Sequence, residues 1–401
     1  MTRGINVVLI AVAMLSVVNI WAADWPKFGG PDGNFIAPDT GINKNWSQKP
    51  PEVLWKVPLG DQGYAGPSVA DGKVFIIDHA GSEDIVRALN LQTGEEVWRF
   101  AYADTSKHNY GYARATPTYA GGKLYTLSRL GLLHCLNAAN GHKIWSVNIK
   151  QRFDGQSPKW NYAASPVVDG NQLIVLPGGN ATGMAALNKD TGETIWTGGR
   201  AGMAGYATPV VATIQGVKQY VAFTGDELYG VRADNGNTLW QFPWKTNHGV
   251  NAAMPIVQKD YIFITSGYGH GCALLQITPQ GPDMYWQSKA IVSHFNTPVF
   301  YKSHVFGTGD QGGLVCLNSR DNKVMWSKPI SKKGGLLAVD GVIIVVSDSS
   351  GDVVMVNASP DNYQELGRIK PLGGKSWTPP VIAHGKLIIR NEQAIACLDL
   401  M

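Results

Sequence analysis

A tryptophan returns along this chain every 40 to 51 residues, and this spacing constrains the fold more than any other feature. A period of about 40–50 residues is typical of a radial or solenoid array, and one period can hold a four-stranded β-sheet. Leu366 follows the last tryptophan by 40 residues and takes the eighth position. The seven tryptophans are Trp55, Trp98, Trp145, Trp196, Trp240, Trp286 and Trp326. One small unit is therefore expected to repeat around or along the molecule.

Each unit reads as short β-strands joined by tight turns. In the unit from Tyr64 to Trp98, a proline opening at Pro67 is followed by an Asp71-Gly72 turn, a β-branched run and a Thr93-Gly94 turn. Such dipeptides between apolar runs indicate hairpins, because glycine supplies the positive φ that these turns need. The proline opening recurs at Pro117, Pro166, Pro209, Pro255, Pro298 and Pro379, with Gly335 standing in for it in the seventh unit. No sustained 3.6-residue period is present in the mature chain, so the fold is expected to be all-β.

The count of strands predicts how the array closes. Eight openings require eight outer strands, yet only seven outer strands follow an inner strand, and the last unit stops after residues 394–400. The missing strand is found near the front, at residues 52–57. Pairing it with the C-terminal strand removes an exposed sheet edge, the known liability of open β structures. We therefore expect an eight-bladed β-propeller of four-stranded antiparallel blades, closed by a strand from each end of the chain.

The units also share a motif, Ala88-Leu89-Asn90-x-x-Thr93-Gly94-Glu95-x-x-Trp98, which returns at residues 186–196. With Ser/Thr-Pro-x-Val and Asp-Gly-x-Val, it resembles the repeat of quinoprotein (pyrroloquinoline quinone-like) β-propellers of the secreted bacterial type. The opening Trp25-Pro26-x-Phe28-Gly29-Gly30-Pro31 is similar to the leaders of secreted members. The resemblance implies the propeller fold but not one function, because the family includes quinone-dependent dehydrogenases and the propeller subunit of outer-membrane protein assembly.

The N-terminal segment predicts export. Arg3 precedes an apolar run of about 14 residues that ends in Trp21-Ala22-Ala23, a pattern typical of a signal peptide and short for a membrane span. We expect a signal peptide at 1–23, an irregular leader at 24–51 and the propeller at 52–401, with an uncleaved anchor as the alternative. Cys135 is the first cysteine, which disfavours a lipid anchor. The mature protein is expected to be periplasmic or secreted, without a membrane span.

The net charge and the cysteine positions argue against a nucleic-acid binder and against disulfide bonds. A net charge of +4 over 401 residues argues against a dedicated nucleic-acid binder, which would need a concentrated basic face. Cys135, Cys316 and Cys397 hold the same place in three different units, too far apart around a ring to form a disulfide. Together with Cys272 they are expected to be small buried residues rather than bridged pairs.

Candidate binding residues precede the proline of each unit. Loops that lead into the inner strands of a propeller share one face and surround the mouth of its central channel, where function is carried by loops on a rigid scaffold. Aromatic and amide side chains there would suit a flat or hydroxylated ligand, although they could instead plug a narrow channel and satisfy one another. The candidates are Tyr64, Tyr112, Arg114, Asn161, Tyr162, Tyr206, His248, Asn251, His294, Lys375 and Trp377.

Two of these loops are longer than the others. Residues 98–117 and 145–166, which lead into the second and third units, are rich in aromatic and basic side chains. Long loops of this composition are where binding surfaces are usually found. We expect these two loops to form the edge that a partner or substrate contacts. The alternative is that they are long loops that bind nothing.

Two functions remain open at this stage. The first is a binding or assembly scaffold, expected to be a monomer, whose partner is an envelope protein or a small polar ligand. The alternative is a pyrroloquinoline quinone-dependent alcohol or sugar dehydrogenase with Ca²⁺, in which Trp377 could lie beneath the quinone. For that branch the resemblance implies adjacent cysteines and a Glu-Asn-Asp set, but no two cysteines are adjacent here and the carboxylates are scattered. No catalytic residue, metal ligand or required cofactor is assigned from the sequence.

Overall fold

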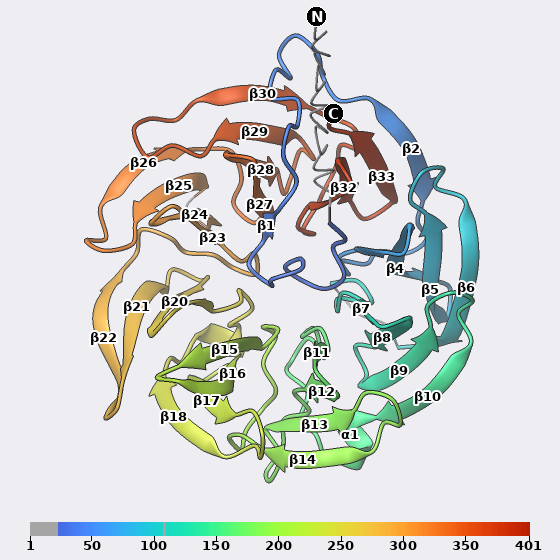
Figure 1. The fold of residues 1–401 in the computed structure, drawn as a ribbon, viewed down its shortest axis with the longest axis vertical. Helices are drawn as coiled ribbons and strands as arrows, with labels where there is room; N and C mark the ends of the chain where they lie inside the picture. The colour runs from blue at the N-terminus through green and yellow to red at the C-terminus, as the bar shows by residue number, and fades with distance from the viewer. Residues whose placement is uncertain (1–22, 107–109, 311) are drawn as a thin grey trace, which may run out of the picture.

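Eight four-stranded sheets are arranged around a central channel, as Figure 1 shows. The computed structural model describes residues 23–106, 110–310 and 312–401. The expected signal peptide, apart from its last residue, lies outside these residues. No helix in the described part of the chain is long and apolar enough to cross a membrane. The prediction of an all-β, eight-bladed propeller of antiparallel blades is confirmed.

Seven blades are continuous in sequence, each running from the channel outward. Blade 1 contains β3 (Ser68–Ala70), β4 (Lys73–Ala80), β5 (Glu83–Asn90) and β6 (Glu96–Ala103). Blade 2 contains β7 (Thr118–Ala120), β8 (Lys123–Leu127), β9 (Leu132–Asn137) and β10 (Lys143–Asn148). Blade 3 contains β11 (Val167–Asp169), β12 (Gln172–Val175), β13 (Met184–Asn188) and β14 (Thr194–Gly198), and blade 4 contains β15 (Val210–Ile214), β16 (Val217–Phe223), β17 (Glu227–Arg232) and β18 (Thr238–Pro243).

Blades 5 to 7 follow the same order. Blade 5 contains β19 (Ile256–Gln258), β20 (Tyr261–Ser266), β21 (Gly271–Thr278) and β22 (Gly281–Ser288). Blade 6 contains β23 (Val299–Tyr301), β24 (His304–Gly309), β25 (Gly313–Asn318) and β26 (Val324–Lys328). Blade 7 contains β27 (Leu336–Val339), β28 (Val342–Val346), β29 (Val353–Asn357) and β30 (Glu365–Ile369). Two short helices lie between blades, α1 (Ile149–Arg152) and the 3-10 turn η1 (Asn247–Gly249).

Blade 8 is built from both ends of the chain. Its inner strands are β31 (Val381–Ala383), β32 (Lys386–Arg390) and β33 (Ala394–Asp399), and its outer strand is β2 (Val53–Pro58). β2 pairs antiparallel with β33 in a register that places Trp55 opposite Cys397 and Val57 opposite Ile395. The predicted closure is therefore confirmed.

The repeated tryptophans hold neighbouring blades together. In five of the seven, the indole N–H donates to a backbone carbonyl of the next blade, as from Trp98 to Ala138 at 3.0 Å. The ring covers the last turn of that blade: a Cβ on Gly141, whose φ is +75°, would lie 2.5 Å from the Trp98 ring. The Asn/Thr-Gly turn and the tryptophan thus recur together, because the indole packs where a larger turn residue would not fit.

Blade 7 departs from this scheme. Gly367, rather than Leu366, lies opposite Met355 in the register position that the tryptophans hold in other blades. Trp46 from the leader packs directly against Gly367 and is 2 % exposed. A tryptophan from outside the repeat therefore covers the outer strand that has none, and assigning Leu366 to this position was wrong by one residue.

The leader crosses the end of the channel opposite the loops that lead into the inner strands. Its β1 (Ile36–Ala37) pairs parallel with β27, and Trp25 exchanges backbone hydrogen bonds with Val69 of blade 1. Further on, Asp39 accepts a hydrogen bond of 2.7 Å from the Gly385 N–H, in the first turn of blade 8. Figure 1 shows this dark blue segment passing over the centre of the ring.

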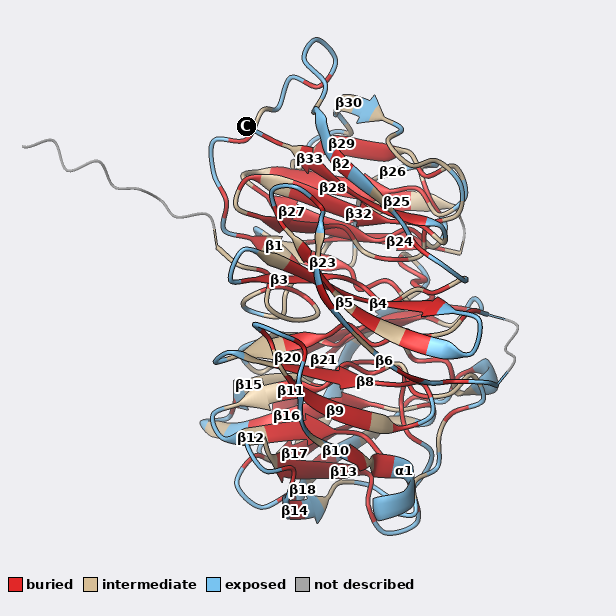
Figure 2. Ribbon diagram, turned by 90° about the vertical axis from the view of Figure 1, so that its right-hand side faces the viewer, coloured by how far each residue is buried: buried red, intermediate tan, exposed pale blue. Residues whose placement is uncertain are grey.

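Burial follows the radial order of the strands. Figure 2 shows buried residues filling the inner strands of the blades and exposed ones along outer strands and loops. The four cysteines are buried and free, as predicted. The core consists of aliphatic and aromatic side chains that pack between successive blades.

Candidate binding site at the channel mouth

Hydroxyl groups at the proline openings fix the loops that lead into the inner strands, here called the lead-in loops. The Thr116 N–H donates to Ser165 Oγ in the next blade, and the Ser165 N–H donates to Thr208 Oγ1 in the blade after, both at 2.9 Å. Met254 and Thr297 repeat the contact between blades 5 and 6 at 2.9 Å. Because a residue before proline favours extended backbone, its N–H at these openings can donate to the hydroxyl of the next blade. The Ser/Thr-Pro motif therefore positions the mouth of the channel.

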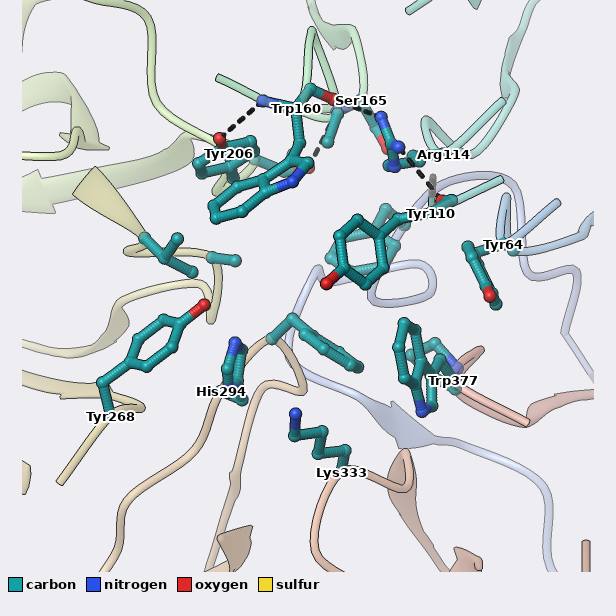
Figure 3. A pocket seen from close by; sticks show the side chains of 18 residues that line it. Tyr64, Tyr110, Arg114, Trp160, Ser165, Tyr206, Tyr268, His294, Lys333 and Trp377 are labelled. Atoms are coloured by element: carbon teal, nitrogen blue, oxygen red, sulfur yellow. Dashed lines mark hydrogen bonds between the residues drawn. The ribbon is translucent and has the colours of Figure 1, made fainter. Parts of the chain in front are cut away.

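A cavity of about 410 Å³ opens at this mouth, within the range of small-molecule sites. Side chains from the lead-in loops of all eight blades line it, and Phe28 of the leader reaches it from the opposite end of the channel. Its larger lining side chains are Phe28, Tyr64, Tyr110, Arg114, Trp160, Tyr206, Tyr268, His294, Phe295, Lys333 and Trp377, most of which Figure 3 labels.

Aromatic rings form most of the wall. Tyr64 and Trp377 are stacked with ring centroids 4.9 Å apart, and Phe295 adjoins Trp377 at 5.0 Å. On the other side, Trp160 lies 6.0 Å from Tyr110 in an edge-to-face arrangement and 6.3 Å from Tyr206. Rings held in these geometries offer faces and edges to a planar guest.

Two cationic side chains reach the cavity. Arg114 donates to the backbone carbonyls of Trp160, Tyr110 and Gly111, which hold the guanidinium in place. Burial lowers the pKa of Arg114 to about 10, and repulsion from Arg129 acts in the same direction. Lys333 lies over the rings of Phe295 and Trp377, with Nζ 5.9 and 5.8 Å from their centroids. Among the described lining residues there is no carboxylate, so the cavity has positive charge and aromatic walls.

The Tyr64–Trp377 stack is supported from behind by an ion pair. Lys375 Nζ lies 3.7 Å from the Trp377 ring centroid and 2.9 Å from Glu392 Oε1. The same carboxylate accepts from the Tyr64 hydroxyl at 2.6 Å and from Gln62. Burial acts to raise the pKa of Glu392, but the hydrogen bonds from Tyr64, Lys375 and Gln62 leave it below its ordinary value. Lys375 is thus neutralised outside the cavity and positions the stack.

The structure brings five of the eleven candidate residues together around the cavity, namely Tyr64, Arg114, Tyr206, His294 and Trp377. His248 is near the rim, with its ring edge-to-face with Trp160 and Tyr268 at 5.9 and 5.6 Å. Asn161 takes a left-handed φ of +67° in the lead-in loop of blade 3, and Lys375 lies behind Trp377.

Three other candidates point away from the cavity. Tyr112 stacks on His79 with ring centroids 3.3 Å apart. Tyr162 is buried between blades and donates to the Pro177 carbonyl at 2.8 Å. Asn251 is fully buried and bonds to the Thr224 carbonyl and to Ser266 Oγ. These side chains fix loops to the scaffold.

Several lining residues were missed as candidates. Tyr110 and Trp160 were not among the eleven candidates, but they lie in the two long lead-in loops that were predicted to form the edge for a partner or substrate. Lys333 precedes the one inner strand that lacks a proline opening, and Tyr268 follows the second strand of blade 5. Phe28 belongs to the leader, and no repeat position points to it.

The lining chemistry does not suit a quinone held by Ca²⁺. Calcium requires six to eight oxygen ligands, usually including carboxylates. Here the described lining residues contribute hydroxyls, an imidazole and two cations, and the described chain has no group of three His, Cys, Asp or Glu residues placed to hold a metal. The residues around this cavity therefore do not fit the metal-bound cofactor.

Comparison with known proteins supports the family resemblance of the repeated sequence motif. A family model described as outer membrane protein assembly factor BamB (PQQ_2) matches residues 82–300 and 286–361. The Escherichia coli K12 protein named outer membrane protein assembly factor BamB is 25 % identical over 327 residues, covering 78 % of this chain and 81 % of that protein.

Solved structures share the fold at low identity. BamB from Moraxella catarrhalis superposes with a TM-score of 0.62 at 16 % identity, over 87 % of this chain and 97 % of that one. A europium-containing methanol dehydrogenase gives 0.68 at 12 % identity, over 92 % and 89 % of the two chains. The family model spans most of the propeller, and the chain belongs to the BamB-like (PQQ_2) family of pyrroloquinoline quinone-like β-propellers.

Proposed function

We propose that this protein is an exported, periplasmic scaffold that binds a partner in outer membrane protein assembly through the mouth of its channel. The single observation that carries the proposal is the convergence of aromatic and cationic side chains from seven of the eight lead-in loops on one cavity. Tyr, Trp and Arg are the residues most often found at the energetic centre of protein interfaces. The family and the name of the Escherichia coli relative supply the class of partner.

Exposed side chains extend this surface beyond the cavity. Tyr110, Tyr268 and Met203 are 47 %, 41 % and 46 % exposed, and each comes from a loop near the mouth. Lys159 lies over the Trp160 ring at 5.0 Å and adds a basic group at the rim. An apolar centre with a charged margin is the usual arrangement of a transient interface.

A genetic experiment tests this role. Deleting the gene in the organism that produces the protein should lower the amount of folded β-barrel protein in its outer membrane, and the wild-type gene should restore it. A Trp160→Ala, Tyr268→Ala double variant should restore little. Tyr285→Ala is the matched control, because Tyr285 is 58 % exposed on the outer strand of blade 5. Thermal unfolding of both variants checks that they fold. A deletion without effect, or equal restoration by the double variant, contradicts the proposal.

A quinone-dependent dehydrogenase is the second candidate, favoured by the position of Trp377 in the wall of the cavity. The missing carboxylates weigh against it. Ca²⁺ should not change the unfolding midpoint measured with pyrroloquinoline quinone, and the two together should support no reduction of an artificial electron acceptor by alcohols or sugars. A shift that requires Ca²⁺, together with turnover, would replace the scaffold with the enzyme.

A further inference from the structure

We infer that the cavity at the channel mouth binds a small aromatic anion, such as an aryl carboxylate, without a metal ion. The inference rests on the proposed binding role and names the ligand class of the same site. It depends on three features of the cavity: its walls, its charge and the position of Lys333.

The walls select a flat apolar group. Trp377, Phe295, Trp160 and Tyr206 contribute ring faces or edges on both sides of the space. A ring inserted between them would gain stacking and edge contacts as well as removal of apolar surface from water. A cavity of about 410 Å³ has room for a ligand of one to three fused rings.

Lys333 supplies the charge that a ligand would neutralise. Its Nζ makes no ion pair or side-chain hydrogen bond with any described residue, and its half-buried side chain passes over Phe295 and Trp377. Figure 3 shows it reaching toward the cavity beside His294. The neighbouring Asp310 attracts Lys333 electrostatically but forms no ion pair with it. Its carboxylate accepts from His294 Nδ1 at 3.2 Å and from the Tyr268 N–H at 2.7 Å.

Other charges around the cavity agree with an anionic guest. Arg114 places a second positive charge on the opposite side of the space. Lys375 is already paired with Glu392 and is not a lining residue. A carboxylate beside Lys333 would lie in a site walled by rings, with Arg114 as a second positive charge across the space, and opposite charges attract more strongly there than in bulk water.

The experiment compares two ligands of the same shape. Binding of 2-naphthoate and of its neutral isostere 2-naphthamide to the mature chain is measured by titration calorimetry in metal-free buffer and again with Ca²⁺. We expect naphthoate to bind at least tenfold more tightly than the amide, without need of Ca²⁺, and more weakly as salt is added.

Two lysine variants test whether Lys333 supplies the positive charge that binds the carboxylate. Lys333→Met keeps the length and apolar character of the side chain, and should weaken naphthoate at least fivefold while leaving the amide unchanged. Lys332→Met is the matched control, because Lys332 is exposed and does not line the cavity. Equal affinity for the two ligands, an unchanged naphthoate affinity in Lys333→Met, or binding only with Ca²⁺ would overturn the inference. Naphthoate binding without any assembly defect on gene deletion would instead refute the proposed role and leave the inference intact.

Discussion

Tyr64 and Trp377 stack with ring centroids 4.9 Å apart, although one leads into blade 1 and the other into blade 8. The wall of the cavity therefore crosses the seam where the ring closes. Lys375, Glu392 and Thr378 connect the same two blades, with the Thr378 hydroxyl donating to the Tyr64 carbonyl at 3.1 Å. Closure of the propeller by β2 and β33 is thus a condition for the candidate site as well as for the fold.

Removing residues 395–401 should unfold or aggregate the protein. The deletion takes away most of β33, the strand between β32 and β2, and exposes two strand edges at once. Removing Met401 alone, which is 59 % exposed, should have little effect. Thermal unfolding followed by circular dichroism distinguishes the two, and a longer deletion that melts like the full chain would contradict the closure.

Gly141→Ala should destabilise the protein more than Gly122→Ala. Both glycines belong to blade 2 and have nearly the same φ, +75° and +76°, so an alanine costs about 1–2 kcal/mol in either backbone. Only at Gly141 would the new Cβ meet the Trp98 ring, which adds about 1–3 kcal/mol, whereas nothing lies within 4 Å at Gly122. Denaturant unfolding of the two variants measures the difference in unfolding free energy. Equal losses of stability would show that the contact with the Trp98 ring does not restrict the residue at position 141.

Asp104→Asn should cost about 3–5 kcal/mol of unfolding free energy, because it leaves the Arg129 guanidinium buried without its charge partner. Both side chains are 1 % exposed, and Arg129 Nε and Nη2 lie 2.7 and 2.8 Å from the carboxylate. Asp226→Asn, from an exposed pair with Lys245 at 3.8 Å, should change stability by about 0.5 kcal/mol or less. Similar losses in the two variants would show that the buried pair of Asp104 with Arg129 adds no more stability than an exposed pair.

His134 should make the protein less stable in mild acid. Burial, followed by repulsion from Lys143, lowers its pKa to about 4 from an ordinary 6.5. The unfolded chain therefore binds the proton more readily, so the contribution is complete above pH 6.5 and is lost as the pH falls toward 4, by up to about 3 kcal/mol.

His134→Leu removes this group from its contacts with Phe100 and Tyr102. Unfolding free energies measured at pH 7 and pH 4.5 should therefore differ less for the variant than for the wild type. An equal pH dependence in both proteins would show that His134 is not the source.

The fold could be predicted from the sequence because each repeated element is determined by residues close to it in the chain. Proline openings, glycine turns and docking tryptophans recur at fixed places, and the missing outer strand followed from a count. Blade 7 shows the limit of this reasoning: Gly367 is covered by Trp46, a contact between distant parts of the chain that no repeat position encodes.

The candidate site could be predicted only in part, because the repeat motif does not specify the backbone conformation of the lead-in loops. At Asn161 a left-handed φ of +67° reverses the chain, so that Trp160 faces the cavity while Tyr162 enters the core. Phe28 and Lys333 come from the leader and from the blade without a proline opening. Their places depend on tertiary packing and not on position in the repeat.

Site-specific photo-cross-linking tests the central claim, that the channel mouth is the binding face, most directly. A benzophenone amino acid replaces Tyr268 at the mouth or Tyr285 on the outer strand of blade 5, two tyrosines that are 41 % and 58 % exposed. Irradiation of the producing cells should link the protein with benzophenone at 268 to an outer membrane assembly component and give no such product from position 285. Adducts from 285 alone, or equal adducts from both positions, would contradict the account.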